Sequence, residues 1–332
     1  MLSIGVAGES PQNGHPFSFS AIFNGFDSDK IRAAGWGLIA DYLNSGMPQQ
    51  IGGLGARVTH VWFPDRDRAN LLSEATEVDF VSDSFDEMVA EVDAVMILRD
   101  DWESNLDMAL SSLRLGKPTF VDKPLSLSSA DLDVFEPYLR SGLLMTGSGL
   151  RFSPELANVW MKSSLGRARD KPMTIVASGP GDWEHNSMHL LEPSFVLAKT
   201  LGLSPVEQGL FSVSGTIGFG PDNHGSFVPN ALNEQDIKSE ADKKLFFSAE
   251  RLVLVMELRN AAQNPPFQLE CDVGGGVRVA VRLQNRLAAF RELLSAFVAT
   301  ASSGVAVVDP EETMWCLRRA EEGQKWITGF TE

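Results

Sequence analysis

The sequence predicts an α/β protein of two domains: an N-terminal domain with a parallel sheet and a C-terminal α/β domain with an antiparallel sheet. Its 332 residues are enough for two cores at roughly 150 residues per domain. Residues 1–125 alternate short apolar strands with helical segments, the pattern of right-handed βαβ units. Beyond Leu150, longer strands follow one another with few helices between them, which indicates antiparallel pairing.

The first predicted elements are a strand, a loop and a helix. Residues 2–8 (LSIGVAG) form a β-rich run that closes in glycine, and the aromatic-rich segment 15–26 has Pro16 in its first turn. Glycines interrupt a weak helical pattern over residues 27–56, which we interpret as an insertion. Strands and helices then alternate regularly up to residue 124.

The C-terminal half changes character. The predicted strands are 173–178, 209–215, 251–259, 267–273 and 277–284. The tail returns to helix over 287–304 and 310–329. We therefore expect domains at 1–125, with the insertion 27–56, and at 126–332, with the C-terminal helices packing back.

The charge excludes polyanionic partners. Lys and Arg number 28 against 44 Asp and Glu, which gives a formal net charge of −16. Such a surface repels nucleic acid and anionic membranes, so neither is expected as a partner. A small anion can still bind at a helix N-terminus.

The cysteines and the N-terminus indicate a cytoplasmic protein. Cys271 and Cys316 lie in apolar runs without a CxxC pair or metal-ligand spacing, so we expect both to be reduced core residues. No basic region followed by an apolar stretch opens the chain, and no window resembles a membrane span.

A polar loop follows the first predicted strand. A dinucleotide site needs glycines here so that backbone N–H groups can approach a pyrophosphate. With Gly8 as the first glycine of G-x-G-x-x-G, Ser10 and Asn13 take the second and third positions, and Gly14 fits only a longer loop. These four residues are predicted to bind a dinucleotide; the alternative is a plain strand-turn-helix connection.

Asp65 ends the second predicted strand, where a carboxylate can bind the adenosine ribose of NAD. It lies 57 residues after Gly8 rather than about 20, a distance that the insertion explains. Arg66 and Arg68 offer guanidinium groups that could instead hold the 2′-phosphate of NADP. The predicted cofactor is therefore NAD or NADP, and a helix cap is the alternative role for Asp65.

The segment FVDKP at 120–124 places Lys123 at the end of a strand, beside Asp122 and before a proline. An ammonium there can point into a cleft and polarise a hydroxyl or carbonyl oxygen, with Asp122 modulating its pKa. The alternative is an exposed lysine in a turn.

Three segments resemble one enzyme family. GKPTFVDKPLSLS at 116–128 resembles the GKHVFVEKPLA segment of the glucose-fructose oxidoreductase, inositol dehydrogenase and MocA (Gfo/Idh/MocA) family. LRFSPEL at 150–156 is similar to its RF-x-P segment, and residues 185–202 are similar to its DxGxHxxDxxxxLLG helix. The resemblance implies an NAD- or NADP-binding Rossmann domain followed by an α/β domain with an open, mainly antiparallel sheet.

In that family a Lys, an Asp and a His act on a substrate alcohol. Lys123 matches the lysine, and His189 matches the histidine that takes or returns the hydroxyl proton. His185 stands at the aspartate position and does not supply the same fixed negative charge. Asp182 and Glu184 are near enough in sequence to substitute.

Other positions depart from the family pattern. RDDW at 99–102 replaces a threonine-proline motif, and the family's helix histidine aligns with Asn105. Asp100, at the end of the fourth predicted strand, and Lys123 are also among the predicted cofactor residues.

Arg151 and Trp183, together with His185 and His189, are the predicted substrate-binding residues, because hydroxyl-rich ligands favour planar donors and an aromatic platform. The loop 218–230 could add His224, although a solvated loop histidine is the simpler interpretation.

A metal site is the alternative use of the histidines. His185, His189 and Glu192 share one helical face. We predict no metal, because Asn186 stands where a zinc protease motif requires glutamate.

Together these residues predict an NAD(P)-dependent oxidoreductase that transfers a hydride to or from a sugar, cyclitol or related polyol or keto compound. One alternative is an enzyme that uses the cofactor without net redox change, such as a glycoside-cleaving enzyme that forms a transient 3-keto sugar. Another is a non-catalytic binding or regulatory protein on a degenerate scaffold. Apolar runs at 252–258 and 277–283 predict a homo-oligomer, a dimer or a tetramer.

Overall fold

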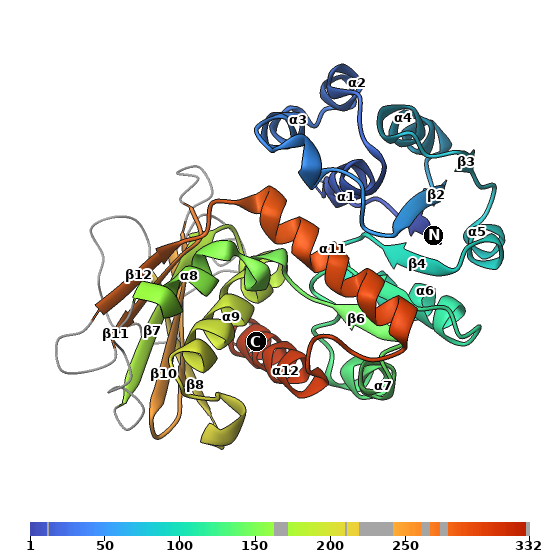
Figure 1. Ribbon diagram of the computed structural model, residues 1–332. Coiled ribbons are helices and arrows are strands. Elements are labelled where there is room, and N and C mark those ends of the chain that lie inside the picture. Colours follow the sequence, from blue (N-terminus) through green and yellow to red (C-terminus); the bar gives the residue numbers. More distant parts are fainter. Residues whose placement is uncertain are drawn as a thin grey trace. The chain divides into compact units, whose positions relative to one another are not determined.

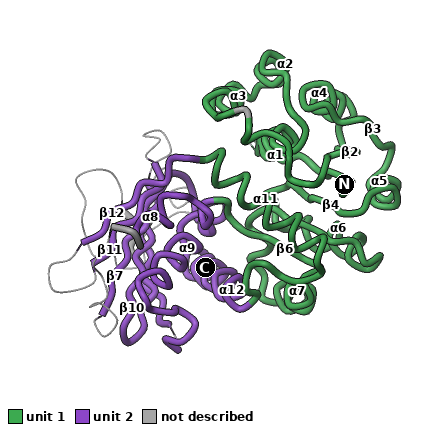
Figure 2. Tube along the Cα trace, in the orientation of Figure 1, with its two compact units in different colours: residues 1–149, 286–310 green, residues 150–285, 311–332 purple. Residues whose placement is uncertain are grey.

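The computed structural model describes residues 1–11, 13–162, 172–209, 211–218, 242–259, 266–272 and 278–329. The chain divides into two compact units, each built from two separate stretches of sequence (Figure 2). Unit 1 comprises residues 1–149 and 286–310, and unit 2 comprises residues 150–285 and 311–332. Each unit has its own six-stranded sheet.

The sheet of unit 1 is parallel throughout its described pairings and has the strand order β3-β2-β1-β4-β5-β6 (Figure 1). The order reverses between β1 and β4, and ligands bind at the carboxyl ends of the strands at such a reversal. The strands are β1 (Leu2–Ala7), β2 (Ala56–Trp62), β3 (Phe80–Val81), β4 (Ala94–Ile97), β5 (Thr119–Val121) and β6 (Leu144–Thr146).

Several helices of unit 1 begin where the sequence supplies a side-chain cap. Asp27, Asp65, Ser84 and Ser128 each accept a hydrogen bond from a backbone N–H group in the first turn of the helix that follows. The helices are α1 (His15–Asn24), α2 (Ser28–Ala33), α3 (Gly37–Asn44), α4 (Arg66–Thr76), α5 (Phe85–Glu91), α6 (Asn105–Leu113), α7 (Ser129–Arg140) and α11 (Arg286–Ser303), with 3-10 helices η1 (Pro48–Gln50) and η2 (Trp102–Ser104).

The predicted insertion, residues 27–56, folds as α2, α3 and η1 and ends in the first residue of β2. Helix α3 contacts both α1 and α11. Arg291 of α11 donates from Nη1 to the carbonyl oxygens of Gln50 and Gly52, at 2.9 and 2.8 Å. The segment is therefore integrated into unit 1.

Unit 2 contains the sheet β12-β11-β7-β10-β9-β8, with helix α9 along one face (Figure 1). Its pairings are antiparallel except that β7 and β10 run parallel. The strands are β7 (Met173–Pro180), β8 (Ser212–Gly218), β9 (Asp242–Ser248), β10 (Leu252–Arg259), β11 (Gln268–Asp272) and β12 (Arg278–Arg282). The helices are α8 (Pro154–Lys162), α9 (Trp183–Thr200) and α12 (Pro310–Thr328), with the 3-10 helices η3 (Gly149–Phe152) at the boundary and η4 (Val206–Gln208).

The structure confirms the predicted fold class, a parallel sheet in one domain and a mainly antiparallel sheet in a second. Unit 1 extends past residue 125, because β6 pairs with β5. It also includes α11, whose Phe297 packs edge-on against Phe120 of β5, with ring centroids 5.7 Å apart.

Both cysteines are free thiols buried in unit 2. Burial raises the pKa of Cys271 to about 12 and raises that of Cys316 well above its usual value, so neither is a reactive thiolate at neutral pH. In the described part of the chain, every helix is too short or too polar to cross a membrane.

Candidate active site

The carboxyl ends of β1, β4 and β5 bring three predicted segments to one edge of the unit 1 sheet. Gly8 follows β1, Asp100 lies just beyond β4, and Lys123 lies just beyond β5. Gly8 has φ +76°, a conformation that favours glycine. Carbons Cγ and Cδ of Arg99 also lie 2.5 Å from the place where a Cβ would stand. Backbone conformation and space therefore both require glycine at position 8.

Ser10 and Asp100 are joined across this edge. Ser10 is buried, its hydroxyl is hydrogen-bonded to Oδ1 of Asp100, and the backbone N–H of Asp100 donates back to its Oγ at 3.1 Å. This reciprocal pair fixes the loop after β1 against the end of β4. The structure thus brings two predicted cofactor residues together.

Asn13 and His15 converge on the buried carboxylate of Asp122. Asn13 donates from Nδ2 to Oδ2 of Asp122 at 2.9 Å, and Nδ1 of His15 lies 2.6 Å from the same oxygen. Burial raises the pKa of Asp122, but the charge and hydrogen bond of His15, the charge of Lys123 and the hydrogen bond of Asn13 outweigh it and lower the pKa to about 2. Asp122 is therefore an anion at neutral pH.

Lys123 is buried beside this carboxylate, and its backbone N–H donates to Oδ1 of Asp122 at 2.8 Å. The chain that follows is held by Asn105 at the start of α6, whose Nδ2 donates to the carbonyl oxygens of Pro124 and Leu125 at 3.1 and 3.2 Å. Oδ1 of Asn105 is buried without a hydrogen-bond partner among the described residues. Lys123 is thus fixed on both sides by neighbouring elements.

Gly14 precedes α1, and space is the main constraint on it. Its φ of −94° suits any residue, but a Cβ there would collide with Cδ1 of Ile39 and lie 2.8 Å from Cε3 of Trp36, both from the predicted insertion. Helix α1 has no acidic side chain in its first turn. The carboxylate of Asp122, bound by His15 and Asn13, nevertheless places a negative charge at the start of this helix.

The residues after β2 have separate roles. Oδ1 of Asp65 accepts from the backbone N–H groups of Asp67 and Arg68 at 2.9 and 3.3 Å, so Asp65 caps α4. Arg66 is largely exposed and pairs with Asp83. Asp65 therefore has the alternative role that the sequence predicts, a helix cap. Its carboxylate also lies just after the end of β2.

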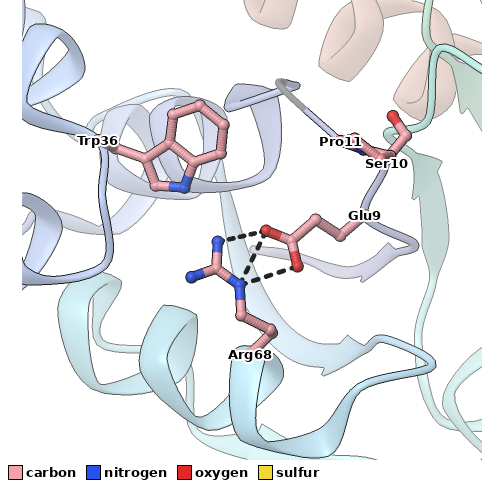
Figure 3. Close-up of a pocket in the computed structure, with 5 residues that line it drawn as sticks. All are labelled: Glu9, Ser10, Pro11, Trp36 and Arg68. Atoms are coloured by element: carbon pink, nitrogen blue, oxygen red, sulfur yellow. Dashed lines mark hydrogen bonds and ion pairs between the residues drawn. The ribbon is translucent and has the colours of Figure 1, made fainter.

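A cavity of about 340 Å³ lies next to the loop after β1 (Figure 3). It is lined by Glu9, Ser10, Pro11, Trp36 and Arg68. Glu9 and Arg68 form an ion pair in it, with Nη2 to Oε1 at 2.5 Å and Nε to both carboxylate oxygens at 3.1 and 3.2 Å. The cavity thus joins the predicted dinucleotide loop, α4 and the segment after α1.

In unit 2, the predicted histidines lie on α9. Asp182 caps this helix, and its Oδ1 accepts from the backbone N–H of His185 and lies 2.8 Å from Nδ1 of the same residue. His189, one turn later, packs its ring edge-to-face with Phe267, with centroids 5.1 Å apart. Asp182, one of the two predicted acidic substitutes, is therefore paired with His185.

The other two predicted substrate residues lie in the interior of unit 2. Trp183 donates from Nε1 to the carbonyl of Ala320 at 2.7 Å and stacks against Phe247. Arg151 donates to Glu192 at 3.0 Å and to Glu312 at 3.1 Å. Burial lowers the pKa of the Arg151 guanidinium. The nearby negative charges, mainly those of Glu192 and Glu312, outweigh the effect of burial and raise the pKa above its usual value.

Sequence reasoning missed three residues at the edge of the unit 1 sheet. The sequence predicts only a helix start at His15 and a loop at Glu9, and it places Arg99 in a segment that departs from a family motif. The guanidinium of Arg99, next to Gly8, pairs with Asp101. Charged and titratable side chains in these segments are visible in the sequence. Their partners are not, because His15 and Asp122 are 107 residues apart. The predicted loop 218–230, with His224, lies outside the described residues.

Within the described ranges, no group of three or more His, Cys, Asp or Glu side chains is arranged to hold a metal ion.

Part of unit 1 matches the model of a known protein family. Residues 34–136 match the model of a protein family described as "Oxidoreductase family, NAD-binding Rossmann fold". A stretch of 122 residues is 38% identical to inositol 2-dehydrogenase 2 of Saccharopolyspora erythraea; it covers 34% of this chain and 36% of that protein. The chain therefore matches about a third of the length of this relative.

Solved structures match over nearly the whole chain at low identity. Apo scyllo-inositol dehydrogenase from Lactobacillus casei has a TM-score of 0.66 at 15% identity, covering 96% of this chain and 94% of that one. Myo-inositol 2-dehydrogenase from Lactobacillus plantarum has 0.66 at 13%, covering 98% and 97%. UDP-N-acetylglucosamine 3-dehydrogenase from Acidithiobacillus ferrooxidans has 0.64 at 15%, covering 100% and 99%. At such identities these matches establish the shared fold alone.

Proposed function

Because residues 34–136 match an oxidoreductase family with an NAD-binding Rossmann fold, we propose that the chain is a nicotinamide-dependent dehydrogenase of the Gfo/Idh/MocA family. It acts on a CH–OH group of a small polyol, cyclitol or sugar. The 38% identity to an inositol 2-dehydrogenase over 122 residues supports this assignment.

The observation that carries the proposal is the fixed, charged surrounding of Lys123. Lys123 is buried just beyond β5, on the sheet edge where doubly wound folds bind ligands. The carboxylate of Asp122 beside it is held by His15 and Asn13 and stays ionised at neutral pH. An ammonium in this position donates a hydrogen bond to the substrate oxygen and stabilises negative charge that develops on it.

The residues of unit 1 fit a bound dinucleotide. Gly8 turns the chain at positive φ directly after β1. This conformation suits the close approach of a pyrophosphate to the backbone of the loop. When bound, the nicotinamide takes up or returns the hydride. Ser10, Asn13, Gly14, Asp65, Arg66 and Asp100 complete the set of residues that we assign to cofactor binding.

The proton-transfer role goes to His189, as the family resemblance implies. We assign His185 to the same face of α9, with the Asp182 carboxylate bound to its Nδ1 as a source of negative charge. Such a carboxylate fixes the tautomer of an imidazole. Because Trp183 and Arg151 are engaged inside unit 2, we assign them to holding α9 in place.

The test combines cofactor reduction and variants. Purified protein is incubated with NAD or NADP and a panel of cyclitols, polyols and sugars, and formation of the reduced nicotinamide is followed. A substrate-dependent signal that Lys123→Met abolishes supports the proposal. An enzyme without net redox change would convert substrate with no net release of NADH, and a binding protein would show no turnover of any panel compound.

A further inference from the structure

The Glu9–Arg68 ion pair stands where a Rossmann domain distinguishes NAD from NADP. In this fold a carboxylate at the end of β2 binds the ribose 2′-hydroxyl of NAD, or a nearby arginine holds the 2′-phosphate of NADP. Arg68 lies in the first turn of α4, three residues after Asp65, and Glu9 directly follows Gly8. Both line the cavity beside the loop after β1 (Figure 3).

Arg68 is held from three sides. Its Nε and Nη2 donate to the Glu9 carboxylate. Its Nη1 donates to the carbonyl oxygen of Ala34 at 3.0 Å, and the guanidinium lies over the ring of Phe17, 5.5 Å from the centroid. Turning toward a phosphate therefore costs Arg68 several established interactions.

The charges around the cavity also disfavour the binding of a 2′-phosphate. Arg66, the other cation that follows β2, is paired with Asp83. Asp65 and Asp67 lie at the start of α4, and Glu9 faces the cavity itself (Figure 3). A 2′-phosphate carries about two negative charges at neutral pH, so it meets carboxylates and no unpaired guanidinium among these groups. A ribose hydroxyl instead finds acceptors.

We propose that Glu9, by neutralising and holding Arg68, makes the dinucleotide site select NAD over NADP. The proposal rests on the proposed function, because it specifies the cofactor of that site. Glu9 acts in part through Arg68, so removal of its charge turns Arg68 into an available phosphate ligand.

Selectivity is measured by titrating dinucleotide-free protein with NADH and with NADPH, following nicotinamide fluorescence. The wild type is expected to bind NADH more tightly. Glu9→Gln keeps the size of the side chain and removes its charge, so the ratio of the NADPH to the NADH dissociation constant is expected to fall by about tenfold. In the double variant Glu9→Gln with Arg68→Gln, most of that gain for NADPH is lost, because no guanidinium remains to bind the phosphate.

The matched control is Glu74→Gln on the same helix. Glu74 is 66% exposed and pairs with Lys30 at 3.5 Å, so its variant should keep the wild-type ratio. Retained NADH affinity in Glu9→Gln shows that the variant is folded.

Three outcomes contradict the inference. A wild type that binds NADPH as tightly as NADH overturns it and leaves the dehydrogenase proposal intact. A ratio that is unchanged in Glu9→Gln also overturns it, because another residue must then set the preference. Binding of neither nucleotide overturns the proposed function and this inference together.

Discussion

Nδ1 of His15 lies 2.6 Å from Oδ2 of Asp122 and thereby joins the start of α1 to the end of β5. The ring of His15 also stacks on Phe19 and meets Phe290 of α11 edge-on. The side chain of Asp122 is 2% exposed and is kept ionised by this contact and by its other neighbours. The loop that follows β1 and the strand that carries Lys123 are therefore mechanically and electrostatically coupled.

This coupling predicts a pH-dependent contribution to stability. The pKa of Asp122 is lowered from 3.8 to about 2 in the folded protein. A carboxyl group whose pKa is lower in the folded than in the unfolded protein stabilises the fold at any pH above its unfolded pKa. This stabilisation is lost as the pH falls toward the folded pKa. Asp122→Asn should therefore lower the free energy of unfolding by about 2 kcal/mol at neutral pH, and the difference from wild type should shrink between pH 4 and pH 2.

Urea unfolding of both proteins across this range measures the effect. Asp86→Asn, in the first turn of α5, is the control and should show no such convergence. A difference between wild type and Asp122→Asn that stays constant down to pH 2 would contradict the role given to the His15–Asp122 contact.

Lys123→Met should abolish turnover without abolishing cofactor binding. Loss of a cation that stabilises developing charge costs a factor of at least about a hundred in kcat. NADH titration measures the retained binding, and initial rates measure the loss. Lys30→Met, at an exposed position of α2, is the control. Wild-type rates in Lys123→Met would remove this lysine from the mechanism.

His189→Asn tests the proton-transfer role separately. A general acid–base group contributes about 10²- to 10⁴-fold, so kcat should fall by that order while NADH affinity is unchanged. The pH–rate profile should also lose the limb that His189 supplies in the wild type. A variant with the wild-type profile would assign the proton transfer to another group.

Arg151→Met separates a structural role from substrate binding. It leaves Glu192 and Glu312 without their shared guanidinium, and unpairing a buried charge costs about 3–5 kcal/mol. Urea unfolding measures this loss. Arg140→Met, at an exposed pair with Glu136, should change stability by less than about 1 kcal/mol. A stable Arg151→Met protein with a raised KM would instead place Arg151 against substrate.

The sequence was sufficient for the elements whose local patterns are strong. Apolar runs predicted β1 and β10, and a helix cap was the alternative role predicted for Asp65, because burial and capping act over a few residues. The parallel pairing of β7 with β10 is set between distant segments, and no local pattern encodes it. Strand β6 is three residues long, too short for alternation to be seen.

The candidate site shows the same limit. Lys123 could be predicted because its motif is contiguous. The Glu9–Arg68 pair joins residues 59 positions apart, so only the fold brings these charges together. The indole of Trp183 is suited to stack against a ligand, but in the structure its Nε1 donates to the carbonyl of Ala320 inside unit 2. Side-chain identity alone cannot show which partner a buried donor finds.

The most direct test of the central claim is a titration of dinucleotide-free protein with NADH, following energy transfer from tryptophan to the nicotinamide. Trp36 lines the cavity beside the loop after β1, so it is well placed to report on binding. We predict saturable binding of one NADH per chain, with less energy transfer in Trp36→Phe. Absence of saturable binding of both NADH and NADPH would contradict the assignment of this protein as a nicotinamide-dependent dehydrogenase.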